Sequence, residues 1–446
     1  MLKEYCGIYG VYGDKLAAGL THLGLFALQH RGQESAGITV NEGGRFHSRK
    51  GMGLVSRVFS GKDIEEIKGE SAIGHVRYST SGKSAEENIQ PLMFRQRGVP
   101  MAISHNGTIP RARELRDELE SEGIIFTTSG DSELILQMYA RQKGTREERL
   151  IKVLNRLKGA FSLLILFPGE LYAVRDAMGY RPLVMGKKGK TVLFASETCA
   201  LDLVGAQYER EVKPGEIVRV NKDGRESFFL EKSDTRQCVF ELIYFARPDS
   251  FVFGESVYQA RLNMGRRLAM EAPVKSDLVM PIPDSANIQA LGYARQSGIP
   301  LEFGLLRNHY IGRTFISPRQ ETRDLGVRIK HSPIRKAVRG KRVVIIDDSI
   351  VRGTTSRKLV ELIKNAGAKE IHMRISSPPI KHSCYYGLDT PDKKDLIAAS
   401  KTPAETADFL KVSTLHYLSR EGLERACRTS TGGGYCFSCF SGKYDL

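Results

Sequence analysis

The sequence lacks any apolar run long enough to cross a membrane. A membrane-spanning helix needs about 18 or more apolar residues, whereas the longest apolar stretch, FSLLILF at 161–167, stops at Pro168 and predicts a buried strand. The first residues also lack the apolar segment of a secretory signal. We therefore expect a cytoplasmic protein with no membrane partner.

Cysteine is scarce, and basic residues are not clustered. Seven cysteines, an odd number spread along 446 residues, argue against a disulfide framework and suit a reducing compartment. The net charge is +16, but the densest basic cluster is only GKKGK at 186–190, which predicts a hairpin tip. We interpret the charge as general surface charge plus phosphate handling, and we expect no nucleic-acid partner.

Two patterns divide the chain. Residues 6–230 consist mostly of short strand-like runs separated by turn signals, NEGG at 41–44 and NKDG at 221–224. Two predicted helices, 16–32 and 132–142, interrupt these strands. This half is expected to be an α+β domain in which strands pack against helices.

Residues 231–446 change to an alternation of strands and helices, and the charged stretch 230–237 is the expected junction. Strands are predicted at 276–284, 341–348 and 370–376, with helices at 285–298 and 354–367. Such alternation is typical of an α/β domain, in which crossover helices connect the strands of a parallel sheet.

The stretch VVIIDDSIVRGTTS at 343–356 combines a strand end, two carboxylates and a hydroxyl-rich loop. Ligands of open α/β sheets bind beyond the carboxyl ends of the strands. The free amides of the loop and the helix start that follows favour a phosphate. The carboxylates Asp347 and Asp348 would repel a bare phosphate, so sugar hydroxyls or Mg²⁺ suit them better. The alternative is that they merely cap a helix.

The same stretch resembles the phosphoribosyl-pyrophosphate signature of the type I phosphoribosyltransferases. The resemblance implies that Asp347 and Asp348 face the ribose hydroxyls and Mg²⁺. It also implies that the loop wraps the 5-phosphate through Ser349, Arg352, Gly353, Thr354, Thr355 and Ser356. The stretch 343–356 lacks the GK[ST] of a P-loop, so it is not a nucleoside-triphosphate P-loop.

A second group of motifs surrounds Cys6. They are LQHRGQESAGI (28–38), GHVRYST (74–80), SHNGTI (104–109) and SGDSEL (129–134). As a set they resemble the class II glutamine amidotransferases, which have an Ntn-hydrolase αββα sandwich. The resemblance implies a nucleophilic Cys6 and an oxyanion hole formed by Asn106 and Gly107. Arg77 would pair with the α-carboxylate of glutamine and Asp131 with its α-ammonium group. The alternative is that Cys6 is simply a buried strand residue.

A terminal cysteine carries its own base, because an α-amino group titrates at about 7.7 to 8.0. Residues 1–5 are therefore expected to be a leader that is removed, followed by a glutamine amidotransferase domain at 6–230 and a phosphoribosyltransferase domain at 231–446.

Together the two halves resemble the amidophosphoribosyltransferase family. The resemblance implies that ammonia from glutamine displaces pyrophosphate from phosphoribosyl pyrophosphate, which opens purine synthesis, in a homotetramer inhibited by purine nucleotides. It also places Ser285, which follows Asp284 in PIPDSAN, at the Mg²⁺ site, although a helix-capping role is equally compatible with the local sequence. The basic stretch 307–323, with Arg307 and His309, matches the family's flexible lid.

Four cysteines are candidate metal ligands: Cys238, Cys384, Cys436 and Cys439. Four thiolates can hold structural Zn²⁺ or an iron–sulfur cluster. The resemblance favours a [4Fe–4S] cluster, because one branch of the family pairs it with a short leader. Cys199 and Cys427 fit no motif and are expected to be buried apolar residues.

Two other functions fit part of the sequence. One is a non-catalytic regulator that binds phosphoribosyl pyrophosphate and carries a decayed amidotransferase half, but the set Cys6, Arg77, Asn106 and Asp131 is complete. The other is a zinc-ribbon nucleic-acid binder, which predicts two close CxxC pairs and a basic stripe that the sequence lacks.

Overall fold

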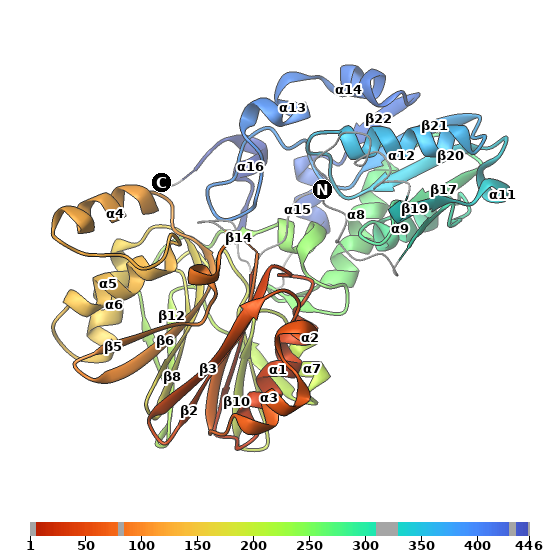
Figure 1. The fold of residues 1–446 in the computed structure, drawn as a ribbon. Helices are drawn as coiled ribbons and strands as arrows, with labels where there is room; N and C mark the ends of the chain where they lie inside the picture. Colours follow the sequence, from red (N-terminus) through yellow and green to blue (C-terminus); the bar gives the residue numbers. More distant parts are fainter. Residues whose placement is uncertain (1–5, 79–83, 309–328, 428–433, 445–446) are drawn as a thin grey trace.

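The computed structural model describes residues 6–78, 84–308, 329–427 and 434–444. Figure 1 shows two parts: stacked sheets flanked by helices in the first half of the chain, and a smaller sheet covered by helices in the second half. His309 and most of the predicted lid at 307–323 lie outside the described residues. Within the described ranges, no helix combines the length and apolarity needed to span a bilayer.

The first half forms two antiparallel sheets. Their strands are β1 (Gly7–Tyr12), β2 (Ser35–Glu42), β3 (Arg45–Met52), β4 (Ser71–Arg77), β5 (Leu92–Gln96), β6 (Val99–Thr108), β7 (Ala160–Phe167), β8 (Glu170–Arg175), β9 (Val184–Lys188), β10 (Thr191–Ala195), β11 (Gln207–Glu211), β12 (Glu216–Asn221) and β13 (Gly224–Phe229). One sheet has the order β11-β9-β10-β1-β4-β2-β3, and the other has the order β13-β12-β8-β7-β6-β5. The three predicted hairpins are confirmed, because β2 pairs with β3, β9 with β10 and β12 with β13.

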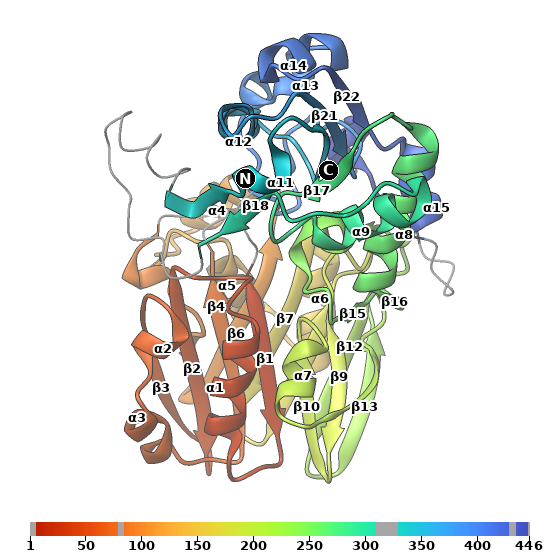
Figure 2. The same cartoon turned by 90° about the vertical axis from the view of Figure 1, so that its right-hand side faces the viewer.

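Alternation along the strands explains how these sheets stack. Ile8 and Ile73 of one sheet pack against Leu164 of the other, in a core between the sheets. Neighbouring residues point outward, where α1 (Ala17–Ala27) and α7 (Cys199–Leu203) cover the first sheet. The helices α5 (Ser132–Arg141) and α6 (Arg146–Arg156) cover the second sheet (Figures 1 and 2). The predicted αββα sandwich is confirmed.

The prediction of only two helices in this half is wrong. The structure adds α4 (Ala112–Ser121) and α6, with the short α2 (Val55–Val58), α3 (Gly61–Glu66) and α7. Six of the ten residues of α4 are charged and only Leu119 is fully buried, so few apolar residues mark this helix in the sequence. α6 begins with a capping box between Thr145 and Glu148, a signal that is visible in the sequence.

The second half confirms the predicted parallel sheet, which consists of β17 (Leu278–Pro281), β20 (Arg342–Asp347), β21 (Glu370–Ile375) and β22 (Thr414–Tyr417). Val344 and Ile346 point to a core with α8 (Val257–Glu271) and α9 (Asn287–Ser297). The alternate residues Val343 and Ile345 point to a core with α12 (Thr354–Asn365) and α14 (Pro403–Leu410). The sheet is therefore buried on both faces, as parallel sheets require.

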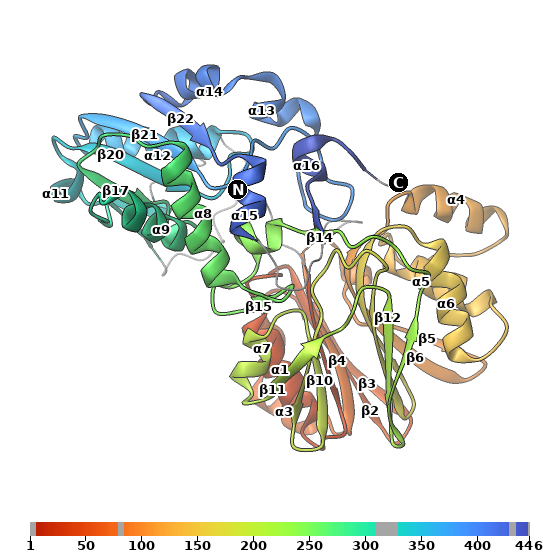
Figure 3. The same cartoon turned by 180° about the vertical axis from the view of Figure 1, so that it is seen from behind.

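Short elements complete the second half. They are β14 (Gln237–Cys238), the π-helix η2 (Glu241–Phe245), β15 (Phe251–Val252), β16 (Glu255–Ser256), β18 (Leu305–Arg307), β19 (His331–Pro333), α11 (Arg335–Val338), η3 (Lys393–Asp395), α13 (Ile397–Ser400), α15 (Arg420–Ala426), β23 (Tyr435–Cys436) and α16 (Ser438–Ser441); η1 (Glu86–Asn88) lies in the first half. β23 pairs in parallel with β14, so the end of the chain returns to the junction between the halves (Figure 3).

The crossing of α8 and α9 provides a test of this packing. A Cβ atom on Gly265 would lie 1.9 Å from the carbonyl oxygen of Gln289. Since neither backbone can retreat from a packed core, Gly265→Ala should lower the free energy of unfolding by about 3 kcal/mol in urea titrations. The control is Gly19→Ala on α1, where a Cβ meets nothing within 4 Å, and a gain of up to about 1 kcal/mol is expected. Equal stability of both variants would contradict the close crossing.

Candidate active sites

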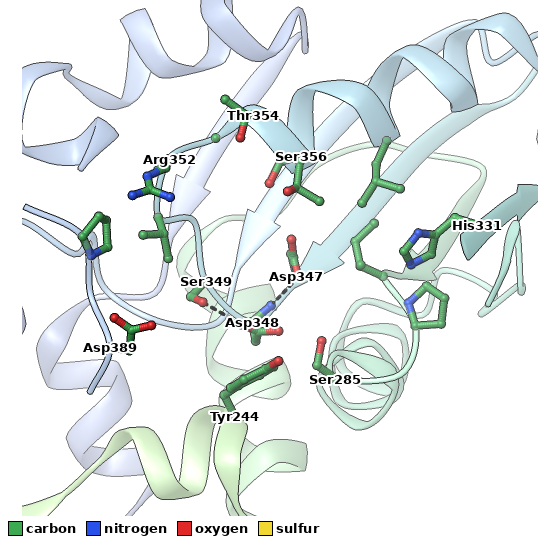
Figure 4. Close-up of a pocket in the computed structure, with 17 residues that line it drawn as sticks. Tyr244, Ser285, His331, Asp347, Asp348, Ser349, Arg352, Thr354, Ser356 and Asp389 are labelled. Atoms are coloured by element: carbon green, nitrogen blue, oxygen red, sulfur yellow. Dashed lines mark hydrogen bonds between the residues drawn. The ribbon is translucent and has the colours of Figure 1, made fainter. Parts of the chain in front are cut away.

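A polar cavity of about 300 Å³ lies at the carboxyl end of β20 (Figure 4). Gly353 adopts φ +72°, which turns the loop into the start of α12. The structure brings together in this cavity all the residues predicted to bind the phosphoribosyl group or Mg²⁺, namely Ser285, Asp347, Asp348, Ser349, Arg352, Gly353, Thr354, Thr355 and Ser356.

The capping alternatives for this site are wrong. α12 has Gly353 as its N-cap residue, so neither Asp347 nor Asp348 caps it. α9 has Ala286 as its N-cap residue, and the Ser285 side chain instead hydrogen-bonds the carboxylate of Asp348. These polar groups are therefore free of a helix-capping role and face the cavity.

Sequence reasoning missed three further polar residues of this cavity. Tyr244 enters from η2, His331 from β19 and Asp389 from a loop near the end of the chain (Figure 4). None of them lies near the signature in sequence, so no local pattern could have found them. Asp284 is not among the lining residues, and its carboxylate pairs with Arg307 at 2.9 Å.

The two carboxylates are held close together out of water. Burial raises the pKa of Asp347, and the charge of Asp348 raises it further. Burial also raises the pKa of Asp348, although hydrogen bonds from Ser285 and Ser349 oppose this. The Ser349 hydroxyl donates to Asp348 at 2.6 Å, and the Asp348 amide donates to Asp347 at 2.9 Å. Carboxylate and hydroxyl oxygens are suitable Mg²⁺ ligands, and a cation here would relieve the repulsion.

A second, small cavity contains Cys6, Arg77, Gly107 and Asp131. Cys6 immediately precedes β1, while the others come from the end of β4, from β6 and from the residue before α5. The cavity has a volume of about 20 Å³, enough for roughly one water molecule. A neighbouring cavity of about 510 Å³ shares Asp131, Thr128 and Gly130 with it. A larger ligand therefore needs the loop at 127–131 to move.

The predicted oxyanion-hole residues lie next to each other on β6. Asn106 is fully buried, and its amide donates to the Ser196 hydroxyl at 3.5 Å. Gly107 lines the cavity, and a Cβ there would lie 1.9 Å from the Ala160 carbonyl oxygen. The structure therefore places Gly107 against the thiol cavity, and Asn106 directly beside it without lining it.

The groups around the thiol do not favour its ionisation. Burial raises the pKa of Cys6, and its thiol donates a long hydrogen bond of 3.5 Å to the Tyr78 carbonyl. Arg77 lowers the pKa, but Asp131 raises it. Burial lowers the pKa of the nearby His105, so that ring is a poor proton acceptor at neutral pH. A different base is therefore needed to form the thiolate.

Two buried side chains that sequence reasoning missed hold the loop at 127–131. Glu133 accepts the amides of Thr127 and Thr128 at distances of 3.0 and 2.7 Å. Asn88 accepts the amides of Ser129 and Gly130, both at 3.0 Å. Asn88 also lines the small cavity, so it orders the loop and contacts the site directly.

The four predicted metal ligands converge from distant parts of the sequence. Cys238 and Cys436 are paired residues of β14 and β23, and Cys384 packs in one apolar cluster with Cys436. Burial raises the pKa of Cys439, and the charges of the other three thiols raise it further. Within the described ranges, however, no three His, Cys, Asp or Glu side chains are already arranged around a metal position. The thiols are neighbours whose side chains must turn to share one ion or cluster.

The comparisons with known proteins agree with this pair of sites. A glutamine amidotransferase domain family matches residues 75–203, and a phosphoribosyl transferase domain family matches residues 263–393. The chloroplastic amidophosphoribosyltransferase of Vigna aconitifolia is 50% identical over 447 residues, covering 100% of this chain and 92% of the relative. The chain belongs to the amidophosphoribosyltransferase family. The family member of Bacillus subtilis is 45% identical, covering 99% of this chain and 94% of the relative.

Solved structures of amidophosphoribosyltransferases extend the match to the whole fold. The structure described as the allosteric regulatory enzyme of purine biosynthesis has a TM-score of 0.94 and 45% identity, with coverage of 98% of this chain and 96% of that chain. The B. subtilis enzyme complexed with ADP and GMP has a TM-score of 0.93. Membership in this family overturns the zinc-ribbon alternative and confirms both domain types.

The buried carboxylates of this family member should reduce its stability at neutral pH. Because their pKa values are raised above the unfolded value of about 3.9, their stabilising contribution is greatest below about pH 4 and declines as the pH rises through the raised values. Asp347→Asn should therefore increase the free energy of unfolding by about 1 kcal/mol at pH 7, but not at pH 4, in urea titrations without Mg²⁺.

The matched control for this prediction is Asp389→Asn, which alters a half-buried carboxylate in the same cavity. Its effect should stay within about 0.5 kcal/mol. A lower free energy of unfolding for Asp347→Asn at pH 7 would contradict this prediction, because it would show that the neighbours of Asp347 and Asp348 already compensate both charges.

Proposed function

We propose that this chain hydrolyses glutamine at Cys6 and transfers the ammonia to phosphoribosyl pyrophosphate, giving 5-phosphoribosylamine, glutamate and pyrophosphate. This is the reaction of its family and the first step of purine synthesis. The observation that carries the proposal is the presence, in one chain, of a thiol cavity and a phosphate cradle with two carboxylates. A non-catalytic regulator would not need the complete thiol site.

The glutamine half begins with nucleophilic attack. The Cys6 thiolate attacks the side-chain carbonyl of glutamine, ammonia leaves, and water then hydrolyses the thioester to glutamate. Arg77 would pair with the α-carboxylate and Asp131 with the α-ammonium group. Gly107 and Asn106 would stabilise the oxyanion. One oxygen of Asp131 accepts the Ile109 amide at 2.9 Å, and the other lies 3.7 Å from Nδ1 of His105.

Removal of residues 1–5 is part of this proposal. Cys6 lacks a suitable base among its described neighbours, and a free α-amino group on Cys6 itself would supply one. The mature chain would then carry the amidotransferase domain at 6–230 and the phosphoribosyltransferase domain at 231–446.

The other half would hold the activated sugar. Amides and hydroxyls from Ser349 to Ser356 surround the 5-phosphate, and Arg352 adds a cation at the rim. Asp347 and Asp348, with Ser285, provide oxygen ligands for Mg²⁺, which would neutralise the departing pyrophosphate when bound. Ammonia then displaces pyrophosphate from the anomeric carbon of the ribose.

We further propose that Cys238, Cys384, Cys436 and Cys439 hold a [4Fe–4S] cluster with a structural role. Burial raises the pKa of Cys238 to about 12, so this thiol resists ionisation unless a cation compensates its charge. Zn²⁺ would satisfy the same four sulfur donors. We choose a [4Fe–4S] cluster over Zn²⁺ because one branch of the family combines this cluster with a short leader.

Partners and location are proposed on the same basis. The B. subtilis relative is described in complex with ADP and GMP, and we propose that purine nucleotides likewise inhibit this chain. We also propose a homotetramer in the cytoplasm, with neither nucleic acid nor membrane as a partner.

The first test of this function separates the two nitrogen sources. Cys6→Ala should reduce glutamine-dependent pyrophosphate release by at least about 10⁴-fold, because the nucleophile is lost. Release driven by ammonium chloride should stay within about twofold, since the phosphoribosyl cavity is unchanged. Cys427→Ala is the control, because Cys427 is buried in the core of the second half and lines neither cavity. Normal glutamine turnover by Cys6→Ala would rule out the proposed nucleophile.

The second test concerns the cysteines and needs no activity assay. Anaerobically purified protein should show broad brown absorbance and about four iron atoms per chain, and Cys436→Ser should lose both. Cys427→Ser is the control, because that buried thiol belongs to the core under α15. A colourless protein with one Zn²⁺ per chain would favour the zinc alternative, and a protein without either metal would overturn the site.

A further inference from the structure

A fully buried guanidinium lies between the two halves of the molecule. Arg31 belongs to the motif LQHRGQESAGI, which the proposed mechanism does not otherwise use. Its Nε donates to the carbonyl oxygen of Cys6 at 3.1 Å. Its two Nη atoms donate to both carboxylate oxygens of Glu241, at 2.9 and 2.7 Å. One side chain of the first half thus holds the backbone of the proposed nucleophile and a carboxylate of the second half.

Glu241 is the first residue of η2, a five-residue π-helix. Tyr244 of the same helix lines the phosphoribosyl cavity. Arg261 of α8 also holds η2, donating to the carbonyl of Leu242 near its start at 2.9 Å and to that of Ala246 just beyond its end at 2.8 Å. Single-turn π-helices occur often at functional sites. Here buried arginines fix the helix at both ends, which leaves it little freedom except to move as a unit.

The charges of this network are compensated on both sides of Arg31. Burial alone would lower the pKa of Arg31, but Glu241 and Glu197 raise it above its usual value. Glu197 accepts the Arg31 guanidinium at 2.6 Å and also the Ser250 hydroxyl at 2.7 Å. Removing one charge of such a buried group leaves its partner uncompensated, which is far costlier than losing a surface ion pair. The position of Arg31 is therefore tightly tied to that of Glu241.

An ordinary structural ion pair is the alternative explanation. The pair Arg210–Glu216 has the same bidentate geometry, with distances of 2.7 and 2.8 Å, and Glu216 is also buried. It joins strands of the first half, and neither residue lines the thiol cavity or the phosphoribosyl cavity. Arg31 differs because its Nε donates a hydrogen bond to the carbonyl oxygen of Cys6. Any displacement of its guanidinium shifts the residue that carries the thiol.

We propose that Glu241 is a positioning residue for glutamine cleavage. Through Arg31 it fixes the position of the Cys6 backbone relative to η2. Because Tyr244 of η2 lines the phosphoribosyl cavity, that relative position depends on what occupies the cavity. This inference rests on the proposed function. It predicts that loss of the Glu241 carboxylate impairs the glutamine reaction selectively, and that it weakens the response of that reaction to phosphoribosyl pyrophosphate.

The test measures three quantities in the full-length Glu241→Gln variant. They are glutamate formation with and without phosphoribosyl pyrophosphate, pyrophosphate release driven by ammonium chloride, and the folded fraction from circular dichroism. Glutamate formation should fall about tenfold in kcat, with KM for glutamine within about twofold. Ammonia-driven release should stay within about twofold. The ratio of glutamate formation with the sugar donor to that without it should shrink toward one.

Two further variants interpret the result. Glu216→Gln, the matched control, should leave all three quantities unchanged, since Glu216 touches neither cavity. Glu241→Asp keeps the charge and should recover part of the glutamine reaction. If Glu241→Gln does not fold, Glu241→Asp decides the matter: it must impair glutamine cleavage more than ammonia use.

Three results would overturn the inference. The first is a Glu241→Gln variant that cleaves glutamine like the unmodified chain. The second is an equal loss of both reactions in proportion to the folded fraction, which indicates a purely structural pair. The third is a ratio of glutamate formation with phosphoribosyl pyrophosphate to that without it that is the same in Glu241→Gln as in the unmodified chain. By contrast, an unmodified chain that releases no pyrophosphate from glutamine would refute the proposed function itself.

Discussion

Burial of ionisable groups beside partners of fixed geometry is the constraint on which both sites depend. Arg31, Glu197 and Glu241 are completely inaccessible, and Asp347 and Asp348 are nearly so. Removing such groups from water is unfavourable unless each finds a partner of fixed geometry. The partners of Arg31 come from both halves of the chain, so the first half cannot place Cys6 independently of the second. The carboxylate pair depends instead on groups of the second half, Ser285 and Ser349. Rigidity at the junction is thus a consequence of charge burial as much as of apolar packing.

Much of the fold could be predicted because its signals are local. The hairpin turns, the buried strand β7 and the run from β20 through Gly353 into α12 each carry their information within a few residues. α4 has few apolar residues and no capping side chain, so neither its core face nor its start was marked, and that helix was missed. The capping box of α6 was a signal that went unused.

The site could be predicted only where a motif contains it. The cradle from Asp347 to Ser356 is contiguous, and the structure brings all of its members into one cavity. Glu133 lies in the motif 129–134 and accepts amides only five and six residues away, whereas Asn88 accepts amides 41 and 42 positions away that folding brings near. The contact between Arg31 and Glu241 spans 210 positions in the sequence. No periodicity reports such pairs, because they depend on how two independently patterned halves dock.

Arg181 links the four-cysteine cluster to the buried ion network of Arg31 and Glu241. Arg181 lies 3.6 Å from Glu241, and its charge lowers the pKa of Cys238 and Cys384. The strand pair β14–β23 has only two residues in each strand, too few to hold the chain terminus alone. Sulfur ligands bound to a common centre would fix that terminus beside Arg181 and thereby beside Glu241. A structural cluster in this position would stabilise the register between the halves without transferring an electron.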